Sequence, residues 1–255
     1  MQPIITLISD WRLRDPYTAI FKGLLQSHLP QANIIDITHH VDFNNLNQTA
    51  FLLQQSYSHF PKGSIHLILT NVSSNSQFNP VLFEYDGHYF IGEDNGIFCL
   101  MFGQKTALKG RIYQNDNNLT SIEKLLSLTQ DVAAGDSFAH TVEHTSFVSK
   151  FMPEAINFIN DRKIEGEIVY IDAYCNALTN IPTDMFLEAT HGKNFQGVII
   201  SKTDWPINEY HEQYVDSSKF YFTNNMLDCL EITYYQGKIA VLADLKVGDK
   251  IEITY

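Results

Sequence analysis

The beginning of the chain alternates apolar runs with a helical repeat. Residues 4–8 form an apolar run that predicts a buried strand, and residues 32–38 predict a second one. Asp15 is expected at the N-cap of the intervening helix and Pro16 at its first position, where proline is favoured. The apolar residues at helical spacing in this helix are Tyr17, Ile20, Phe21, Leu24 and Leu25. The order of strand, helix and strand predicts a βαβ unit at the start of an α/β domain.

The pattern of apolar positions changes after Gly166. Helical runs at residues 46–60 and 119–132 continue the α/β alternation up to that point. Beyond it, short apolar runs follow one another with turn signals such as Gln236-Gly237 between them. The predicted strands are residues 166–172, 197–201, 220–224, 230–235, 239–245 and 251–255. We therefore predict an α/β domain over residues 1–162 and an all-β domain over residues 163–255.

Polar residues gather where the predicted strand at 168–173 ends. Asp172, Tyr174 and Asn176 fall on one face of an extended chain, because strand side chains alternate. A carboxylate, an aromatic face and an amide together suit a nucleoside. The alternative is a strand end whose Asp and Asn residues form a turn. Asp10 is a second candidate, since it ends the first predicted strand at the edge where open α/β sheets bind ligands.

Composition narrows the classes of function. The 255 residues are 44% hydrophobic, enough for two cores without disulfides or metals. A formal net charge of -12 would repel a phosphate backbone, so nucleic acid is not expected as a partner. The three cysteines match neither a disulfide framework nor a metal-ligand pattern. No run reaches the roughly 18 apolar residues of a membrane span. Met1-Gln2-Pro3 leads directly into a strand, so we expect a cytoplasmic protein without metal or cofactor.

Seven segments carry a resemblance to a known family. They are residues 9–17 (SDWRLRDPY), 34–39 (IIDITH), 50–53 (AFLL), 60–66 (FPKGSIH), 94–96 (DNG), 171–181 (IDAYCNALTNI), and 230–232 (LEI) with 247–249 (VGD). In this order they resemble the S-adenosylmethionine (SAM) hydroxide adenosyltransferase family, whose relatives include SAM-dependent chlorinases and fluorinases. The resemblance covers nearly the whole chain.

The resemblance implies a fold, an assembly and a reaction. The expected fold is a Rossmann-like layered α/β domain followed by a small β-barrel. The expected assembly is a homotrimer in which SAM lies between the N-terminal domain of one subunit and the C-terminal domain of its neighbour. The expected reaction is hydrolysis of SAM to adenosine and methionine, by attack of water on the ribose C5′.

The resemblance also implies roles for individual residues. Asp10 would bind the ribose hydroxyls, and Asp172 the methionine ammonium. Tyr174 would contact the face of adenine and Asn176 one of its edges. Further expected ligand positions are Trp11, Ser74, Ser121 and Asn225. Ser74 and Ser121 fall where the halogenases also carry small residues, so a halide nucleophile is the alternative within the family.

The water-activating residues of the family are replaced in this chain. Asn71 stands where the family has its aspartate, and Thr120 where it has its histidine. The family's arginine falls among residues 77–79, none of which is cationic. An amide cannot act as a base. Residues 120–123 instead match the capping box of a helix.

Two hypotheses about activity therefore stay open. The first is SAM hydrolysis with water activated by other groups, for which His39, His40 and Asp94 are candidates. The second is a non-catalytic protein that binds SAM or adenosine. A slow hydrolase fits the first, because losing a general base costs about 10² to 10⁴ in rate.

Recognition of the methionine end also departs from the family pattern. Arg12 replaces a glycine, and could supply a new partner for a carboxylate. Residues 225–228 (NMLD) replace an N-S-x-G segment, so a serine hydroxyl is missing beside Asn225. We expect an adenosine-like ligand, or SAM held by altered contacts.

One motif points to different chemistry. His140 to His144 match the H-x-x-E-H pattern of zinc proteases, with both histidines expected on one face of a helix. The family resemblance argues against a protease. We interpret these histidines as structural and predict no metal site.

Overall fold

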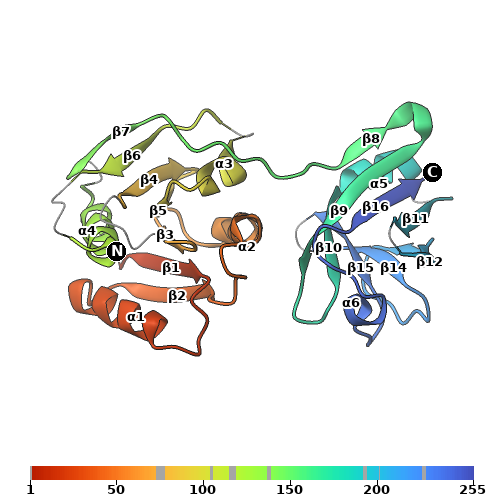
Figure 1. Ribbon diagram of the computed structural model, residues 1–255, viewed down its shortest axis with the longest axis horizontal. Helices are drawn as coiled ribbons and strands as arrows, with labels where there is room; N and C mark the ends of the chain where they lie inside the picture. Colours follow the sequence, from red (N-terminus) through yellow and green to blue (C-terminus); the bar gives the residue numbers. More distant parts are fainter. Residues whose placement is uncertain are drawn as a thin grey trace. The chain divides into compact units, whose positions relative to one another are not determined.

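The chain forms two compact units. The computed structural model describes residues 2–72, 78–103, 106–114, 119–136, 139–191, 194–200, 202–225 and 228–255, with the backbone alone at 202–204. The units are Met1–Phe151 and Met152–Tyr255 (Figure 1). This division lies earlier than the expected one after residue 162, because β8 (Ile156–Phe158) pairs with a strand of the second unit.

The first unit is built on a seven-stranded sheet with the order β2-β1-β3-β5-β4-β6-β7. The strands are β1 (Ile4–Ser9), β2 (Asn33–Thr38), β3 (Ile65–Leu69), β4 (Pro80–Tyr85), β5 (His88–Glu93), β6 (Gly110–Tyr113) and β7 (Thr141–His144). Strands β2, β1, β3 and β5 are parallel. Their carboxyl ends therefore meet at one edge of the sheet, as the βαβ prediction requires.

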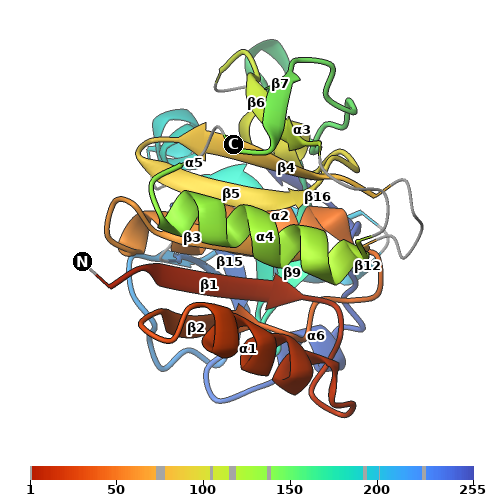
Figure 2. The same ribbon diagram turned by 90° about the vertical axis from the view of Figure 1, so that its left-hand side faces the viewer.

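Helices cover both faces of this sheet. They are α1 (Tyr17–His28), α2 (Leu46–Ser56), α3 (Ile97–Phe102) and α4 (Ser121–Ala133), with the short η1 (Tyr57–His59) after α2. Helices α1 and α4 lie on one face and α2 and α3 on the other (Figures 1 and 2). The helices predicted from apolar spacing are confirmed. The expected cap is wrong by one position, because Pro16 occupies the N-cap of α1 and no side chain caps it.

The H-x-x-E-H segment is a strand and not a helix. Residues 141–144 form β7, which pairs with β6 along its whole length. His140 lies just before the strand with a left-handed backbone, and its ring contacts Asp131, whereas His144 contacts Asp94. The β-branched pair Thr141-Val142 favours this extended conformation. In the described part of the chain, no group of His, Cys, Asp or Glu side chains is arranged to hold a metal ion.

The second unit is a curled, largely antiparallel sheet. Its strands are β8 and β9 (Lys163–Ile171), β10 (Ala177–Pro182), β11 (Gln196–Ile199), β12 (Lys202–Ile207), β13 (Tyr210–His211), β14 (Tyr221–Asn224), β15 (Cys229–Thr233) and β16 (Lys250–Thr254). The order is β12-β11-β16-β9-β10-β15-β14-β13, with β8 added to β9. Among the described pairings none joins β12 to β13, so the sheet forms a half-barrel.

The all-β expectation for this unit is wrong at two helices, α5 (Thr183–Thr190) and α6 (Ile239–Leu242). Residues 239–245 were expected to form a strand. Ile239, Ala240 and Ala243 are buried, while Val241 and Leu242 are 67% and 56% exposed. Burial at this spacing fits a helix packed on one side, whereas a strand would bury alternate residues. A short η2 (Ile159–Asp161) precedes β9.

Each unit has its own core. The first core is formed mainly by β1, β3, α1 and α4, and the second by the inward residues of the curled sheet with α5 and α6. No helix in the described ranges is both long and apolar enough to span a membrane.

A pair of buried histidines lies at the amino-terminal side of the first sheet. His66 on β3 is fully buried, with Nδ1 2.7 Å from Thr6 Oγ1 and Nε2 3.1 Å from Nδ1 of the buried His88. Burial, together with the neighbouring His88, lowers the pKa of His66 to about 3. The pair is therefore neutral at pH 7.

This pair predicts a loss of stability in mild acid. The pKa of His66 is about 3 in the folded protein and about 6.5 in the unfolded chain. As the pH falls from 6.5 towards 3, the unfolded chain binds a proton that the folded protein does not, and the fold loses stability. We expect the unfolding free energy to fall by about 2 kcal/mol between pH 6.5 and 5 through His66. Urea unfolding at several pH values should show a smaller pH dependence for His66→Gln. The exposed His59→Gln should behave like the unchanged protein, and an equal effect in both variants would contradict the assignment.

Candidate functional site

Asp10 follows β1 at the carboxyl edge of the first sheet. Its side chain is 9% exposed, and Oδ2 accepts hydrogen bonds from the backbone N–H groups of Asn44 at 3.1 Å and Asn71 at 3.2 Å. One carboxylate thus holds the loop before α2 and the loop after β3. Among the described residues, no protein group is hydrogen-bonded to Oδ1. That oxygen is placed to accept a hydrogen bond from a ligand.

An apolar cavity of about 370 Å³ opens at the same edge. It is lined by the turn after β1, the outer side of α1, the segment after β3 and the start of α4: Trp11, Tyr17, Ile20, Phe21, Leu24, Val72, Ser121 and Ile122. The Trp11 ring packs edge-on against Phe21, with the ring centroids 5.6 Å apart. The structure therefore brings Trp11 and Ser121 to one cavity. Ser74 lies outside the described residues.

Arg12 adopts a backbone conformation that favours glycine. Its φ is 62°, in the left-handed region where a side chain carries a steric cost. Contacts hold it there: its N–H donates to His39 O at 2.8 Å, and Nη2 pairs with Asp42 at 3.1 Å. The guanidinium already has a carboxylate partner within the chain. A ligand carboxylate would have to share or displace Asp42.

The three candidates for a relocated base have structural partners or lie at the surface. His39 is buried, with Nδ1 2.7 Å from Ser9 Oγ and Nε2 3.2 Å from Asp36 Oδ1, so it links the ends of β1 and β2. Asp94 accepts from His144 Nε2 at 2.9 Å and from Val148 N–H, so it ties the segment after β7 to the end of β5. His40 is exposed.

The second unit holds the other predicted cluster in a tight turn. Asp172 Oδ1 accepts from the N–H groups of Tyr174 at 2.9 Å and Asn176 at 2.8 Å, and Oδ2 accepts from Asn176 Nδ2 at 3.1 Å. Asn176 Oδ1 in turn accepts from Thr233 Oγ1 at 2.8 Å. The two interpretations of this cluster, a turn at the end of a strand and a ligand site, are therefore compatible. The network fixes the turn, and the turn presents Tyr174, which is 78% exposed.

Tyrosines surround a cavity of about 460 Å³ beside this turn. It is lined by Ala173, Tyr174, Asn176, Tyr214, Tyr221, Thr233, Tyr234, Tyr235, Gln236, Gly237 and Lys238. Such a wall offers aromatic faces for stacking together with hydroxyl and amide groups for hydrogen bonding. The cavity brings Tyr174 and Asn176 together. The second unit thus has a concave aromatic site of its own.

Glu231 is buried near this cavity. Its Oε1 accepts a hydrogen bond from Tyr214 Oη at 2.9 Å, and its side chain is 2% exposed. Burial, and then the nearby charge of Asp172, raise the pKa of Glu231 to about 7, against the opposing effect of the Tyr214 hydrogen bond. This carboxyl group therefore titrates near neutral pH.

Backbone strain gathers at the two sites. Among described residues other than Gly, Asn, Asp and His, positive φ occurs at Arg12, Arg162, Cys175 and Gln236. Three of these four lie at a predicted or observed site, since Arg12 follows Trp11, Cys175 separates Tyr174 from Asn176, and Gln236 lines the tyrosine cavity. Strained positions persist where the surrounding structure enforces them, which is common at binding sites.

Two family models together match most of the chain. The N-terminal domain of the SAM hydroxide adenosyltransferases matches residues 5–151, and their C-terminal domain matches residues 166–252. The chain belongs to the SAM hydroxide adenosyltransferase family. The resemblance seen in the sequence segments is thereby confirmed.

Named relatives agree with this membership, and a solved structure shares the fold. An (R)-S-adenosyl-L-methionine hydrolase from Methanocaldococcus jannaschii is 24% identical over 266 residues, covering 99% of this chain and 96% of the relative. A Thermus thermophilus protein of the same name is 28% identical over 100 residues, which cover 39% of this chain and 38% of that protein. The crystal structure of an uncharacterized conserved protein from Thermotoga maritima has a TM-score of 0.87 at 21% identity, covering 98% and 100% of the two chains.

Two positions that align with the family's water-activating residues have clear structural surroundings. Thr120 is the N-cap of α4, and the predicted capping box with Glu123 is present in both directions. Asn71 is exposed and follows β3 with a φ of 55°, a left-handed conformation that asparagine tolerates. Its backbone N–H donates to Asp10, so Asn71 lies next to the expected ribose position.

Sequence reasoning missed a cation in this region. No residue at 77–79 is cationic, but the ammonium of Lys124 from α4 reaches this segment, with Nζ 2.7 Å from Phe78 O and 3.1 Å from Asn79 Oδ1. The Lys124 side chain is 1% exposed. The position of Lys124 among the apolar residues of α4 could have indicated a buried cation.

Asn225 lies apart from the tyrosine cavity. It occupies the turn between β14 and β15, where its Oδ1 accepts from Cys229 N–H at 3.4 Å. The cavity is lined by Tyr221 and Thr233, which pair at the other end of these two strands. Four residues of extended chain separate Asn225 from Tyr221, or about 13 Å. Within the second unit, the structure does not bring Asn225 to Asp172.

Replacing Lys124 should destabilise the first unit. Lys124→Met keeps the length of the side chain but leaves the Phe78 carbonyl and the Asn79 amide oxygen without this donor. We expect a loss of about 1 to 3 kcal/mol in unfolding free energy, measured by urea denaturation. Lys22→Met removes a surface ion pair and should cost less than about 1 kcal/mol. Equal losses would show that the buried ammonium has no special role.

Proposed function

We propose that this protein hydrolyses SAM to adenosine and methionine. Membership of the family over both domains and the names of its relatives support the reaction. The observation that carries it is the environment of Asp10. The Asp10 carboxylate, whose Oδ1 accepts no hydrogen bond from the described residues, stands at the ligand edge of a parallel sheet beside Asn71 and an apolar cavity. Such a group suits the two hydroxyls of a ribose.

The reaction places most of its demand on the nucleophile. Water attacks the ribose C5′ in line with the bond to sulfur, and the sulfonium leaves as a neutral thioether. The attacking water gives up one proton, and the bond electrons go to sulfur. No acid is needed for the leaving group. Holding water and substrate in line can remove several kcal/mol from the barrier.

The described residues suit positioning better than proton abstraction. In this proposal the amide of Asn71 orients the water, and Thr120 holds the start of α4 beside Ser121. Neither Asn71 nor Thr120 is a base at neutral pH. We therefore propose a turnover about 10² to 10⁴ slower than that of relatives with a general base.

The binding roles follow from the two half-sites. Asp10 binds the ribose hydroxyls, and Trp11 and Ser121 line the neighbouring cavity. Asp172 Oδ2 accepts from the methionine ammonium, and Tyr174 stacks on adenine. Asn176 is largely used within the turn, so its part in adenine recognition is limited to its second Nδ2 hydrogen and the second lone pair of Oδ1. Asn225 and Ser74 are kept as proposed contacts from the family alignment alone.

We also propose that the protein is a homotrimer whose sites lie between subunits, as the family resemblance implies. Asp10 and Asp172 belong to different compact units. In such an assembly the N-terminal half-site of one subunit meets the C-terminal half-site of its neighbour, whose curled sheet would be the expected barrel. We place the protein in the cytoplasm, in keeping with free Cys99, Cys175 and Cys229.

Removal of Asp10 tests the reaction. Incubation of SAM with the protein should yield adenosine by liquid chromatography, and Asp10→Ala should lower the rate about 100-fold or more. Asp15→Ala, which removes an exposed carboxylate outside the cavity, should retain full activity. If the unchanged protein binds SAM in calorimetry but forms no adenosine, the non-catalytic alternative is correct. If it does neither, the proposed ligand is wrong.

Mixed trimers test the shared site. Asp10→Ala and Asp172→Ala subunits are each expected to be inactive as homotrimers. Co-expressed, they should form mixed trimers in which one of the three sites is active, where an intact Asp10 from one subunit meets an intact Asp172 from its neighbour. Purification through two different tags isolates the mixed species. No recovery in a trimer of confirmed composition would place both residues in one subunit's site.

A further inference from the structure

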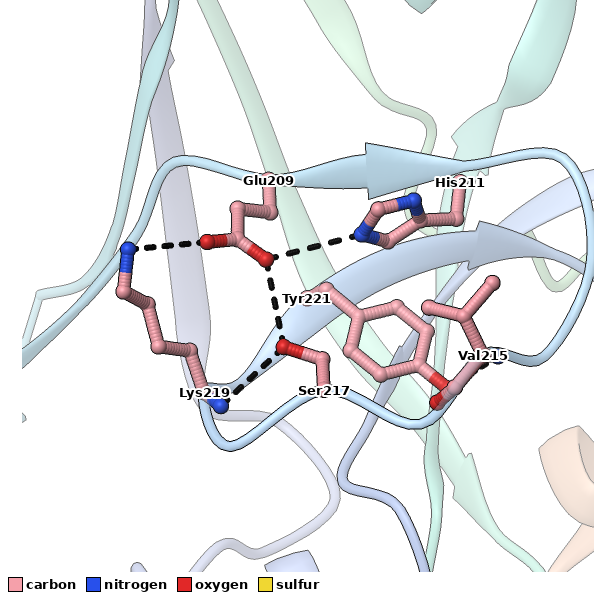
Figure 3. Close-up of polar contacts among 6 residues, drawn as sticks. All are labelled: Glu209, His211, Val215, Ser217, Lys219 and Tyr221. Carbon is pink, nitrogen blue, oxygen red and sulfur yellow. Dashed lines mark hydrogen bonds and ion pairs between the residues drawn. The ribbon is translucent and has the colours of Figure 1, made fainter.

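Hydrogen bonds and an ion pair to Glu209 hold the loop between β13 and β14 together. Figure 3 shows Glu209 between three partners from this segment. Its carboxylate pairs with Lys219 Nζ at 2.8 Å, accepts from Ser217 Oγ at 3.2 Å and lies 3.5 Å from His211 Nε2. Ser217 Oγ also accepts from the Lys219 N–H at 3.1 Å. These contacts close residues 209–219 into a compact loop.

A second set of hydrogen bonds holds the backbone next to Tyr214. The buried Tyr221 hydroxyl accepts from Val215 N–H and donates to Val215 O, each at 3.1 Å (Figure 3). The Tyr221 ring also packs edge-on against His211, with centroids 5.1 Å apart. The backbone beside Tyr214 is thus bound to β14, whose first residue, Tyr221, lines the tyrosine cavity.

Tyr214 is held at its far end as well. Its hydroxyl donates to Glu231 on β15 at 2.9 Å, while 59% of the side chain remains exposed. Exposed tyrosines on loops usually move freely, but this one is fixed at backbone and hydroxyl. It lines the same cavity as Tyr174, whose backbone is fixed by Asp172. The hydrogen-bonded ring of Tyr214, together with the ring of Tyr174 on its fixed turn, offers stacking surface in one cavity at a reduced entropic cost.

We propose that Tyr214 is a second stacking residue for the purine of the ligand, and that Glu231 positions it through their hydrogen bond. This inference rests on the proposed function, since it takes the ligand of the tyrosine cavity to be an adenine nucleoside. Tyr174 and Tyr214 then form two walls for the base. Glu231 itself does not touch the ligand, so it is a positioning residue.

Charge around Glu231 makes the contact sensitive to pH. Asp172 in the turn after β9 and Tyr214 in the loop act on Glu231 directly. The other titratable groups nearby act at one remove, since Tyr221 acts on Tyr214, His211 packs against Tyr221, and Lys238 lines the same cavity as Tyr214. Ionised Glu231 accepts a charge-assisted hydrogen bond from Tyr214, which is stronger than a neutral one. Because burial and Asp172 raise the pKa of Glu231 to about 7, this bond strengthens as the pH rises through neutrality.

Binding of adenosine, whose charge is constant between pH 5.5 and 8.5, tests the stacking role. Calorimetry on the full-length protein at pH 8 should show about 10- to 100-fold weaker binding for Tyr214→Ala. Tyr214→Phe keeps the ring and should weaken binding less than about 5-fold. Asp216→Ala removes an exposed side chain of the same loop and should have no effect. Unchanged affinity in Tyr214→Ala, with a folded circular dichroism spectrum, would overturn the inference.

The pH profile tests the role of Glu231. The unchanged protein should bind adenosine about 3-fold or more tightly at pH 8.5 than at pH 5.5. Both Glu231→Gln and Tyr214→Phe should show a flat profile, because each removes the titrating hydrogen bond. A pH dependence that survives in both variants overturns the coupling. Absence of adenosine and SAM binding in the unchanged protein would overturn the proposed function together with this inference, whereas loss of the Tyr214 effect alone leaves the function standing.

Discussion

A carboxylate that accepts backbone N–H groups organises the candidate site of each unit. Asp10 holds the loops at Asn44 and Asn71 against the end of β1, and Asp172 closes the turn through Tyr174 and Asn176. Each hydrogen bond to an ionised acceptor is stronger than a neutral one. The oxygen atoms that remain are then held still, without cost at the moment of binding. In the proposed function the same two residues also bind the ligand, so replacing either one would remove a structural and a binding role together.

Much of the fold follows from local pattern. The apolar spacing of α1, α2 and α4 and the alternation of β9 agree with the structure, because each of these elements buries one face. The apolar runs of β1 and β2 also form strands, of which β1 is buried on both faces and β2 is only partly buried. Segment 239–245 was misjudged, since its apolar run lacks a period and only packing against the second core decides between strand and helix. The H-x-x-E-H segment was misjudged for the opposite reason. Its spacing suits a helix, but pairing with β6 decides its conformation.

The site was predictable only in part. Asp10, Asp172, Tyr174 and Asn176 could be chosen because they follow β1 or β9, two strands recognisable from their own apolar runs. Lys124 and Glu231 could not be assigned contacts, because their partners Phe78 and Tyr214 lie 46 and 17 residues away along the chain. Such contacts depend on how α4 or a long loop folds back, and residue spacing does not contain that information. The sequence contains many tyrosines after residue 209, but it does not show that they line one cavity.

The two acids of the second unit have a consequence for the ligand. Burial, and then the charge of Asp172, raise the pKa of Glu231, so an ionised Asp172 disfavours the ionised form of Glu231. A cation bound at Asp172 offsets that charge and so favours the ionised form of Glu231. By linkage, binding of a sulfonium or ammonium group then releases a proton near neutral pH, and higher pH favours binding. Adenosine carries no such charge, so its binding does not offset the charge of Asp172 or release a proton in this way. Under the proposed binding roles, the buried Glu231 therefore allows the site to distinguish SAM from adenosine by charge without touching either molecule.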